Sequence, residues 1–216
     1  MAEKSAKKGS LMLFHRVLDE TLAAWSHLAV LRALQDAAQG MSGRELARQA
    51  GLSHQACDRA VSRLEKLHIL QRQRSGRAHF FTLNHNHRLV TEALLPLLAA
   101  ERRFFPEFCK VIRKRFRKST LAVILFGSVA RKQENSSSDV DLCLIVRRAQ
   151  DKSSVEVAAH QAGPVFFRLF GAKLAPILFT AGEFRKKARQ NLPPVADILK
   201  DGVVISGQSL RELSRE

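Results

Sequence analysis

The sequence predicts an α+β protein of two domains, and three observations support that prediction. Apolar residues follow helical spacing over most of residues 11–67, two strand-like runs come next, and strands alternate with helices from residue 119 onward. We therefore expect a helical N-terminal domain that ends in a hairpin, and a C-terminal domain with a mixed sheet and flanking helices. The predicted bounds are a disordered tail over 1–10, the first domain over 11–90, a linker helix over 91–118 and the second domain over 119–216.

Composition narrows the class of protein. Of the 216 residues, 45% are hydrophobic, which is enough for each domain to form a core. No run of 18 apolar residues exists, so we expect no membrane contact, and residues 1–10 lack the pattern of a secretory signal. Three widely spaced cysteines without a CxxC motif argue against a zinc ribbon or a disulfide framework. Together these features predict a cytoplasmic protein.

The net charge of +16 is unevenly distributed along the chain. Residues 1–118 hold 22 Lys and Arg against 10 Asp and Glu, whereas residues 119–216 hold 14 against 10. An excess of positive charge in the N-terminal half is expected if that half binds a polyanion. A generally basic protein with no such partner is the alternative.

Four helices are expected in the first domain. The stretch Leu11–Trp25 is amphipathic, and its apolar stripe predicts a homodimer that pairs through this helix. A helix over His27–Gln39 should end at Gly40. Two short helices then flank the turn at Gly51, capped by Ser42 and Ser53, and the second of them covers His54–Leu67.

A hairpin should follow, because the strand-like runs Ile69–Arg74 and Arg77–Leu83 are separated only by Ser75-Gly76. Residues 27–90 thus resemble winged helix-turn-helix regulators of the broad MarR/ArsR kind. The resemblance implies binding of double-stranded DNA and transcription regulation, and a protein-interaction module of the same fold is the alternative. The expected DNA-binding side chains, from the second helix and the hairpin, are Gln55, Arg59, Arg63, Arg72, Arg74 and Arg77.

The second domain contains the residues on which chemistry is expected. Its first predicted strand, Thr120–Phe126, leads into Gly127-Ser128, and ten residues separate Ser128 from Asp139-Val140-Asp141. Gly-Ser, ten residues and Asp-x-Asp resemble the minimal nucleotidyltransferases of the DNA polymerase β-like superfamily, over about residues 119–206. Further strands are expected over Val140–Val146, Leu174–Phe179 and Val203–Ile205. Helices are expected over Ser154–Phe170, Glu183–Gln190 and Pro194–Lys200, and Pro176 predicts an edge strand or a bulged strand.

Each residue of the motif has a chemical property that suits the binding of a nucleotide and a metal. Gly127 lets the backbone approach a phosphate, and the Ser128 hydroxyl and the following helix N-terminus can donate hydrogen bonds to triphosphate oxygens. Asp139 and Asp141 project from one face of a strand, where two carboxylates suit one or two Mg²⁺ ions. A polar loop capped by Asp139 is the alternative, but it leaves Asp141, a carboxylate within an apolar strand, without a role. The resemblance implies a nucleoside triphosphate, with ATP expected, and adds Arg131 to the nucleotide-binding residues.

Two departures from the family pattern stand out. Lys132 occupies a position at which the family often has glycine, so the loop could differ in shape. The resemblance also implies a third carboxylate that serves as general base, and the strand Lys173–Phe179 has none. Glu183 follows four residues later and is expected to cap the next helix. The site is still expected to be that of a nucleotidyltransferase, although without the third acid it could hold Mg²⁺ and NTP yet transfer nucleotide slowly or not at all.

Three functions remain open at this point. The first is a DNA-binding protein that transfers NMP, with Mg²⁺, from an NTP to an unknown hydroxyl acceptor. The second is a transcriptional regulator whose nucleotidyltransferase domain is degenerate and only binds nucleotide. The third is an antitoxin-like modifier of a protein partner.

Overall fold

The computed structural model describes residues 17–75 and 78–215. It divides into two compact units, which we call unit 1 (Met1–Arg103) and unit 2 (Phe104–Glu216), with the boundary inside helix α5 (Leu95–Phe116). The buried core of unit 1 ends at Leu98, and the two buried clusters of unit 2 begin at Phe108. The predicted tail over residues 1–10 lies outside the described residues. In the described part, no helix combines the length and the apolar character needed to cross a membrane.

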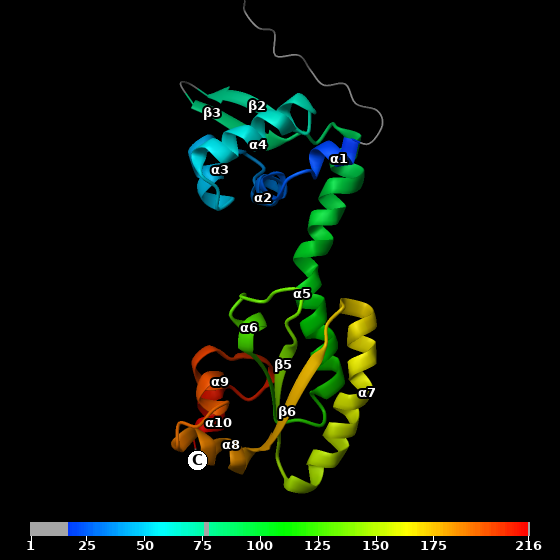
Figure 1. Ribbon diagram of the computed structural model, residues 1–216, viewed down its shortest axis with the longest axis vertical. Coiled ribbons are helices and arrows are strands. Elements are labelled where there is room, and N and C mark those ends of the chain that lie inside the picture. Colours follow the sequence, from blue (N-terminus) through cyan, green and yellow to red (C-terminus); the bar gives the residue numbers. More distant parts are fainter. Residues whose placement is uncertain (1–16, 76–77, 216) are drawn as a thin grey trace, which may run out of the picture. The chain divides into compact units, whose positions relative to one another are not determined.

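Unit 1 has the predicted helix-turn-helix and a hairpin (Figure 1). The predicted position of the hairpin connection at Ser75-Gly76 is wrong, because Ser75 belongs to the first strand and pairs with Ala78 of the second. Ser42 and Ser53 cap the two helices of the motif, and each serine hydroxyl accepts a hydrogen bond from the backbone N–H three residues later. A three-stranded antiparallel sheet in the order β1-β3-β2 completes the unit. The elements are α1 (Val17–Thr21), α2 (Trp25–Leu34), β1 (Met41–Ser42), α3 (Gly43–Gln49), α4 (His54–Lys66), β2 (Leu70–Ser75), β3 (Ala78–Leu83) and the π-helical turn η1 (Val90–Leu94).

The prediction of one helix over Leu11–Trp25 is wrong in its C-terminal part. Helix α1 ends at Thr21, and a new helix, α2, begins at Trp25. The Thr21 hydroxyl donates to the Val17 carbonyl oxygen, and His27 Nδ1 lies 3.1 Å from the Thr21 carbonyl oxygen, so polar groups at the break are satisfied locally. Residues 11–16 of the predicted helix lie outside the described residues.

Helix α2 also ends before the predicted Gln39, at Leu34, and turns connect it to Gly40. Gly40 has a φ of 76°, and a Cβ there would lie 2.7 Å from the Phe81 carbonyl oxygen. A glycine is therefore required at position 40, where the chain passes close to β3 just before β1 begins.

Unit 2 contains a mixed four-stranded sheet in the order β6-β5-β4-β7. The central pair β4–β5 and the pair β4–β7 are antiparallel, whereas β5–β6 is parallel. Of the two alternatives predicted for Pro176, the edge strand is confirmed, since among the described strands β6 pairs with β5 alone. The strands are β4 (Ala122–Phe126), β5 (Val140–Val146), β6 (Leu174–Thr180) and β7 (Val203–Gly207).

Helices cover both faces of this sheet (Figure 1). Helix α7 (Lys152–Phe170) and the C-terminal part of α5 cover one face, and both continue through an internal proline. The other face is covered by α8 (Ala181–Arg189), α9 (Val195–Asp201) and α10 (Leu210–Ser214). The short helix α10 was not predicted, although Ser209 and Glu212 form a capping box at its start.

Candidate nucleotide site and DNA-binding surface

Strand β5 carries Asp141 on one particular face of the sheet. Leu142 and Leu144 belong to the cluster beneath α5 and α7, whereas Cys143 and Ile145 belong to the cluster beneath α8 and α9. Because side chains alternate along a strand, Asp141 points to the same face as Cys143. The carboxylate therefore lies at the α8–α9 face, at the end of the sheet where β5 begins.

Gly127 meets Asp141 at this end of the sheet. Phe126, the last residue of β4, pairs with Asp141 of β5, so the next residue lies against the carboxylate. Gly127 has a φ of 74°, and a Cβ at this position would lie 2.0 Å from Asp141 Oδ2. Only glycine accommodates both the left-handed backbone and the close approach. The fold thus places the Gly-Ser turn directly against the strand that carries Asp141.

Burial raises the pKa of Asp141, the nearby Asp139 carboxylate raises it further, and Arg131 partly offsets both effects. Asp141 is half-buried, whereas Asp139, one residue before β5, is exposed. Among the described residues, neither carboxylate has a hydrogen bond or ion pair of 4 Å or less. Two carboxylates at one site, only partly offset by Arg131, attract a cation.

The other predicted nucleotide-binding residues flank this pair. Ser128 is half-buried in α6 (Gly127–Ala130), which is a single turn. Arg131 follows α6, and its Nη1 lies 3.9 Å from Asp201 Oδ2 at the end of α9. Sequence reasoning missed Asp201, because only the fold brings α9 beside α6.

Lys132 adopts the backbone conformation that glycine would favour. Its φ is 56°, in the left-handed region, and its N–H donates to the Val129 carbonyl oxygen. The loop thus keeps a left-handed residue at this position with a lysine in place of the family's glycine, at a cost of about 1 kcal/mol. Farther along the loop, Asn135 and Ser138 cap one another, so Asp139 is not needed as a cap.

Ala175 occupies the position beside Asp141 on the neighbouring strand. The parallel register of β5 and β6 pairs Asp141 with Ala175, and Ile177 and Phe179 show that odd-numbered residues of β6 point to the α8–α9 face. An acid at position 175 would therefore join the two aspartates, and alanine cannot. Glu183 does not replace it, because its carboxylate accepts from the Thr180 N–H at 2.7 Å and lies 2.6 Å from Lys152 Nζ. The interpretation of Glu183 as a helix cap is confirmed.

The residues present fit a Mg²⁺ ion that is bound together with a nucleotide. In the described part of the chain, no group of three or more His, Cys, Asp or Glu side chains could hold a metal. Mg²⁺ needs only one or two carboxylates when substrate phosphates complete its coordination. Asp139 and Asp141 would be those carboxylates.

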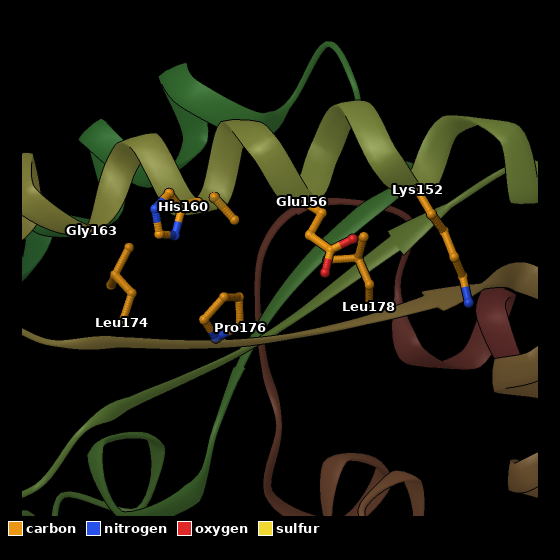
Figure 2. Close-up of a pocket in the computed structure, with 8 residues that line it drawn as sticks. Lys152, Glu156, His160, Gly163, Leu174, Pro176 and Leu178 are labelled. Carbon is orange, nitrogen blue, oxygen red and sulfur yellow. The ribbon is translucent and has the colours of Figure 1, made fainter.

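The hollow drawn in Figure 2 is a different feature of unit 2. It measures about 610 Å³ and lies between α7 and the edge strand β6. Lys152, Glu156 and His160 project into it from α7, toward Leu174, Pro176 and Leu178 (Figure 2). Leu174 and Leu178 pack in the cluster on the α7 face, so the hollow and the Asp141 carboxylate lie on opposite faces of the sheet.

In unit 1, helix α4 buries one stripe and exposes another. Cys57, Ala60, Val61 and Leu64 form the buried stripe. The predicted DNA-binding residues Gln55 and Arg59 are exposed, and they line a shallow hollow together with Lys66. Lys66 was missed by sequence reasoning, although its spacing of seven residues from Arg59 places it on the same face.

The other predicted DNA-binding residues differ in their surroundings. The Arg63 guanidinium forms an ion pair with Glu20 of α1. Arg72 forms two hydrogen bonds with Glu65, at 2.8 and 2.5 Å, and lies over the Phe81 ring. Arg74 is exposed on β2, and Arg77 lies outside the described residues. Arg63 and Arg72 therefore also hold elements of unit 1 together.

Comparison with known families agrees with this geometry. Residues 107–202 match the family model of the nucleotidyltransferase domain, and residues 26–71 match that of the winged helix-turn-helix DNA-binding domain. The chain joins a winged helix-turn-helix domain to a nucleotidyltransferase domain. No curated protein matches the chain. The nucleotidyltransferase match contains Gly127, Asp139, Asp141 and Ala175, so the missing third acid falls within the matched region.

Proposed function

We propose that this protein is a DNA-binding transcriptional regulator whose nucleotidyltransferase domain binds a nucleoside triphosphate with Mg²⁺ and transfers NMP slowly or not at all. The observation that carries the proposal is the site itself, in which Gly127 lies against a half-buried Asp141 and Ala175 stands beside it. Two carboxylates suffice to bind a nucleotide with its metal, whereas transfer also needs a proton acceptor.

The proposed binding mode assigns a role to each residue. Gly127 leaves room for a phosphate at the end of β4, and the Ser128 hydroxyl can donate to a phosphate oxygen. Arg131 supplies positive charge next to the carboxylates. A bound Mg²⁺ would neutralise phosphate charge and orient the α-phosphate. ATP is the nucleotide that we expect at this site.

Transfer would require more than this set of residues. An acceptor hydroxyl oxygen would form a bond to the α-phosphorus, the bond from that phosphorus to the bridging oxygen would break, and pyrophosphate would leave. The hydroxyl proton must pass to a base, and the Ala175 methyl group cannot accept it. General base catalysis typically contributes 10²- to 10⁴-fold, so its loss would leave only slow transfer.

NMP transfer is the second candidate, because both aspartates of the motif are present. Incubation with radiolabelled ATP and Mg²⁺, read for pyrophosphate release, separates the two candidates. We expect ATP binding by calorimetry with little release in the wild type. In Ala175→Asp we expect release to rise, provided that an acceptor is supplied, and Ala175→Asn is the matched control. Wild-type release as fast as that of Ala175→Asp would favour the enzyme.

The aspartates themselves provide the direct test of nucleotide binding. Asp139→Asn combined with Asp141→Asn should abolish Mg²⁺-dependent ATP binding, while circular dichroism shows a folded protein. Unchanged binding in this double variant would refute the assignment of the metal-binding residues.

Substitutions in α4 test the proposed binding of DNA. Arg59→Ala should cost about 1–3 kcal/mol on a preferred site, because arginine can form two hydrogen bonds to a guanine edge. Lys66→Ala, on the same face, should weaken binding to all sequences if that lysine meets phosphate. If the wild-type protein shows no salt-dependent affinity for DNA, the winged domain is a protein-interaction module.

A further inference from the structure

The structural units change the distribution of charge that the sequence suggested. Unit 2 holds 20 Lys and Arg against 11 Asp and Glu, a net of +9, whereas unit 1 holds 16 against 9, a net of +7. The difference from the sequence-based division arises because the basic run over 110–118 lies in the unit 2 part of α5. The nucleotidyltransferase unit is therefore at least as basic as the DNA-binding unit.

Part of this charge is gathered around one hollow of unit 2, of about 360 Å³. Lys118 lines it just after the end of α5, and Arg147 and Arg148 line it just after the end of β5. These three cations come from two segments that are about 30 residues apart in the sequence. We call them, with this hollow, the β5-end basic cluster.

The cations of the cluster are available to a ligand. All three are exposed, and in the described part of the chain none forms an ion pair within 4 Å. The only acid that lines the hollow is Asp151, and its Oδ2 accepts a hydrogen bond from the Arg148 backbone N–H at 3.2 Å. Asp151 thus contributes to the start of the α7 segment, and its single negative charge leaves the hollow with an excess of two positive charges.

The hydroxyl groups that line the hollow add little hydrogen-bond donation. Ser119 and Thr120 both donate to the Phe116 carbonyl oxygen, and Ser154 donates to that of Asp151. Donors to a ligand are therefore the three cationic side chains. Exposed cations that are not part of a specific hydrogen-bonding pocket are suited to binding phosphate groups through charge.

This cluster is separate from the nucleotide site. Thr120 precedes β4 and Arg147 follows β5, whereas Gly127 follows β4 and Asp139 precedes β5. The two sites lie at opposite ends of the same pair of strands, about 17 Å apart along a five-residue strand. A nucleotide held by Asp139 and Asp141 does not occupy the cluster.

Two other hollows in the described part of unit 2 differ from the cluster in their lining. The hollow of Figure 2 is lined by Lys152, Glu156 and His160, and Lys152 is paired with Glu183. Another hollow is lined by Arg185, Lys186 and Arg189, but all three belong to α8, and a charged stripe on one helix is the usual form of a solvated face.

We propose that the β5-end basic cluster binds the phosphodiester backbone of double-stranded DNA, without reading sequence, as a second DNA contact of the chain. Duplex DNA is the occupant favoured here because the chain carries a winged helix-turn-helix DNA-binding domain. Once that domain holds a duplex, phosphates are present at high local concentration for the rest of the chain. The cluster adds affinity and salt dependence, while α4 and the hairpin supply sequence preference.

The test compares two double variants of the full-length chain that remove the same charge. Arg147→Ala with Arg148→Ala removes two cations of the cluster, and Arg185→Ala with Lys186→Ala removes two from α8. Binding to a random-sequence duplex is followed by fluorescence anisotropy at several salt concentrations. We expect the slope of log K against log [salt] to fall by about 1.8 in the first variant, or about 0.9 for each lost phosphate contact. We expect almost no change in the second.

Two further measurements identify the ligand. The Gln55→Ala, Arg59→Ala variant should still bind duplex DNA non-specifically. This binding should weaken when Arg147→Ala and Arg148→Ala are added. Calorimetry with ATP and Mg²⁺ should give the same affinity for the cluster variant as for the wild type. Equal slopes in the two double variants, loss of ATP binding, tighter binding of single-stranded RNA than of duplex, or no DNA binding by the wild type would each overturn the proposal.

Discussion

Gly127 is the residue at which the backbone of the nucleotide site is most constrained. Gly127→Ala should lower the free energy of unfolding by at least about 1–2 kcal/mol, because alanine is disfavoured at a φ of 74°. The new Cβ would also displace the Asp141 carboxylate, from which it would lie 2.0 Å, so Mg²⁺-dependent ATP binding should be lost. Urea unfolding and calorimetry measure the two effects.

Gly163 provides the matched control, because it lies inside α7 and a Cβ there would meet no other group within 4 Å. Gly163→Ala should raise the stability by up to about 1 kcal/mol and leave ATP binding unchanged. Wild-type ATP affinity in Gly127→Ala would show that the close approach to Asp141 has no functional role.

Asp141 should cost the protein stability at neutral pH. Its pKa is raised by burial and by Asp139, so the folded state binds the proton more tightly than the unfolded state does. The stability of the wild type should therefore fall as the pH rises from the ordinary aspartate pKa through the raised one. Asp141→Asn carries no such charge and should be more stable than the wild type at pH 7, with the difference vanishing at low pH.

Urea unfolding of the two proteins at a series of pH values measures this difference. Nucleotide binding should change in the opposite direction, because Mg²⁺ needs the ionised carboxylate and the wild type loses affinity as the pH falls through the pKa of Asp141. A less stable Asp141→Asn at pH 7 would mean that the carboxylate is structural.

At the scale of elements, Glu183 at the start of α8 can be tested for two roles, a helix cap and a residue of the nucleotide site. Its pKa is lowered, first by the hydrogen bond with Lys152 and then by the Thr180 N–H. A lowered pKa gives stability that is present above the ordinary glutamate pKa and is lost as the pH falls through the lowered value. Glu183→Gln should lower the free energy of unfolding at pH 7 by less than about 1 kcal/mol, because the pair is largely exposed.

ATP binding should be the same in Glu183→Gln as in the wild type, since a cap does not touch the nucleotide. Glu156→Gln, in the neighbouring α7, is the control, because Glu156 forms no ion pair within the described residues. A Glu183→Gln variant that stays stable but loses nucleotide affinity would contradict the interpretation of Glu183 as only a helix cap.

Local sequence patterns predicted the elements whose signals are local. Strand β5 was predicted with its observed bounds, and Ser53 was predicted as the cap of α4. The break between α1 and α2 was not predicted, because the apolar spacing continues through Leu22 while the polar contacts of Thr21 and His27 end the helix. Apolar periodicity does not report such contacts.

The same division holds for the candidate nucleotide site. Gly127, Asp139 and Asp141 were proposed from the sequence because their spacing is read directly from the chain, and the structure places Gly127 against Asp141. That Ala175 stands beside Asp141 depends on the parallel register of β5 and β6, which joins residues 34 positions apart. Likewise, the pairing of Arg63 with Glu20 depends on the packing of α1 near α4, so the sequence identified Arg63 as exposed and DNA-facing.

At the scale of the whole molecule, the two units have separate hydrophobic cores. The buried side chains of α5 stop at Leu98 in unit 1 and resume at Phe108 in unit 2. Pro106, which lacks the N–H of a helical hydrogen bond, lies between them. Since none of the buried residues in residues 17–75 and 78–215 belongs to clusters of both units, each unit should unfold in a transition of its own.

Scanning calorimetry of the full-length chain should therefore resolve two transitions, each shifted by one ligand only. A ligand at 100 times its Kd stabilises the unit that binds it by about 2.7 kcal/mol. For a unit of this size, that corresponds to a rise in Tm of roughly 10–20 °C.

ATP with Mg²⁺ should raise the Tm of the unit 2 transition, and Asp139→Asn with Asp141→Asn should remove that rise without moving the transition of unit 1. A short duplex should raise the transition of unit 1, and Arg59→Ala should reduce this rise. If the β5-end basic cluster also binds duplex, the transition of unit 2 should rise with duplex as well, and only while Arg147 and Arg148 are present. A single transition that either ligand moves as a whole would show that α5 couples the two units into one cooperative structure.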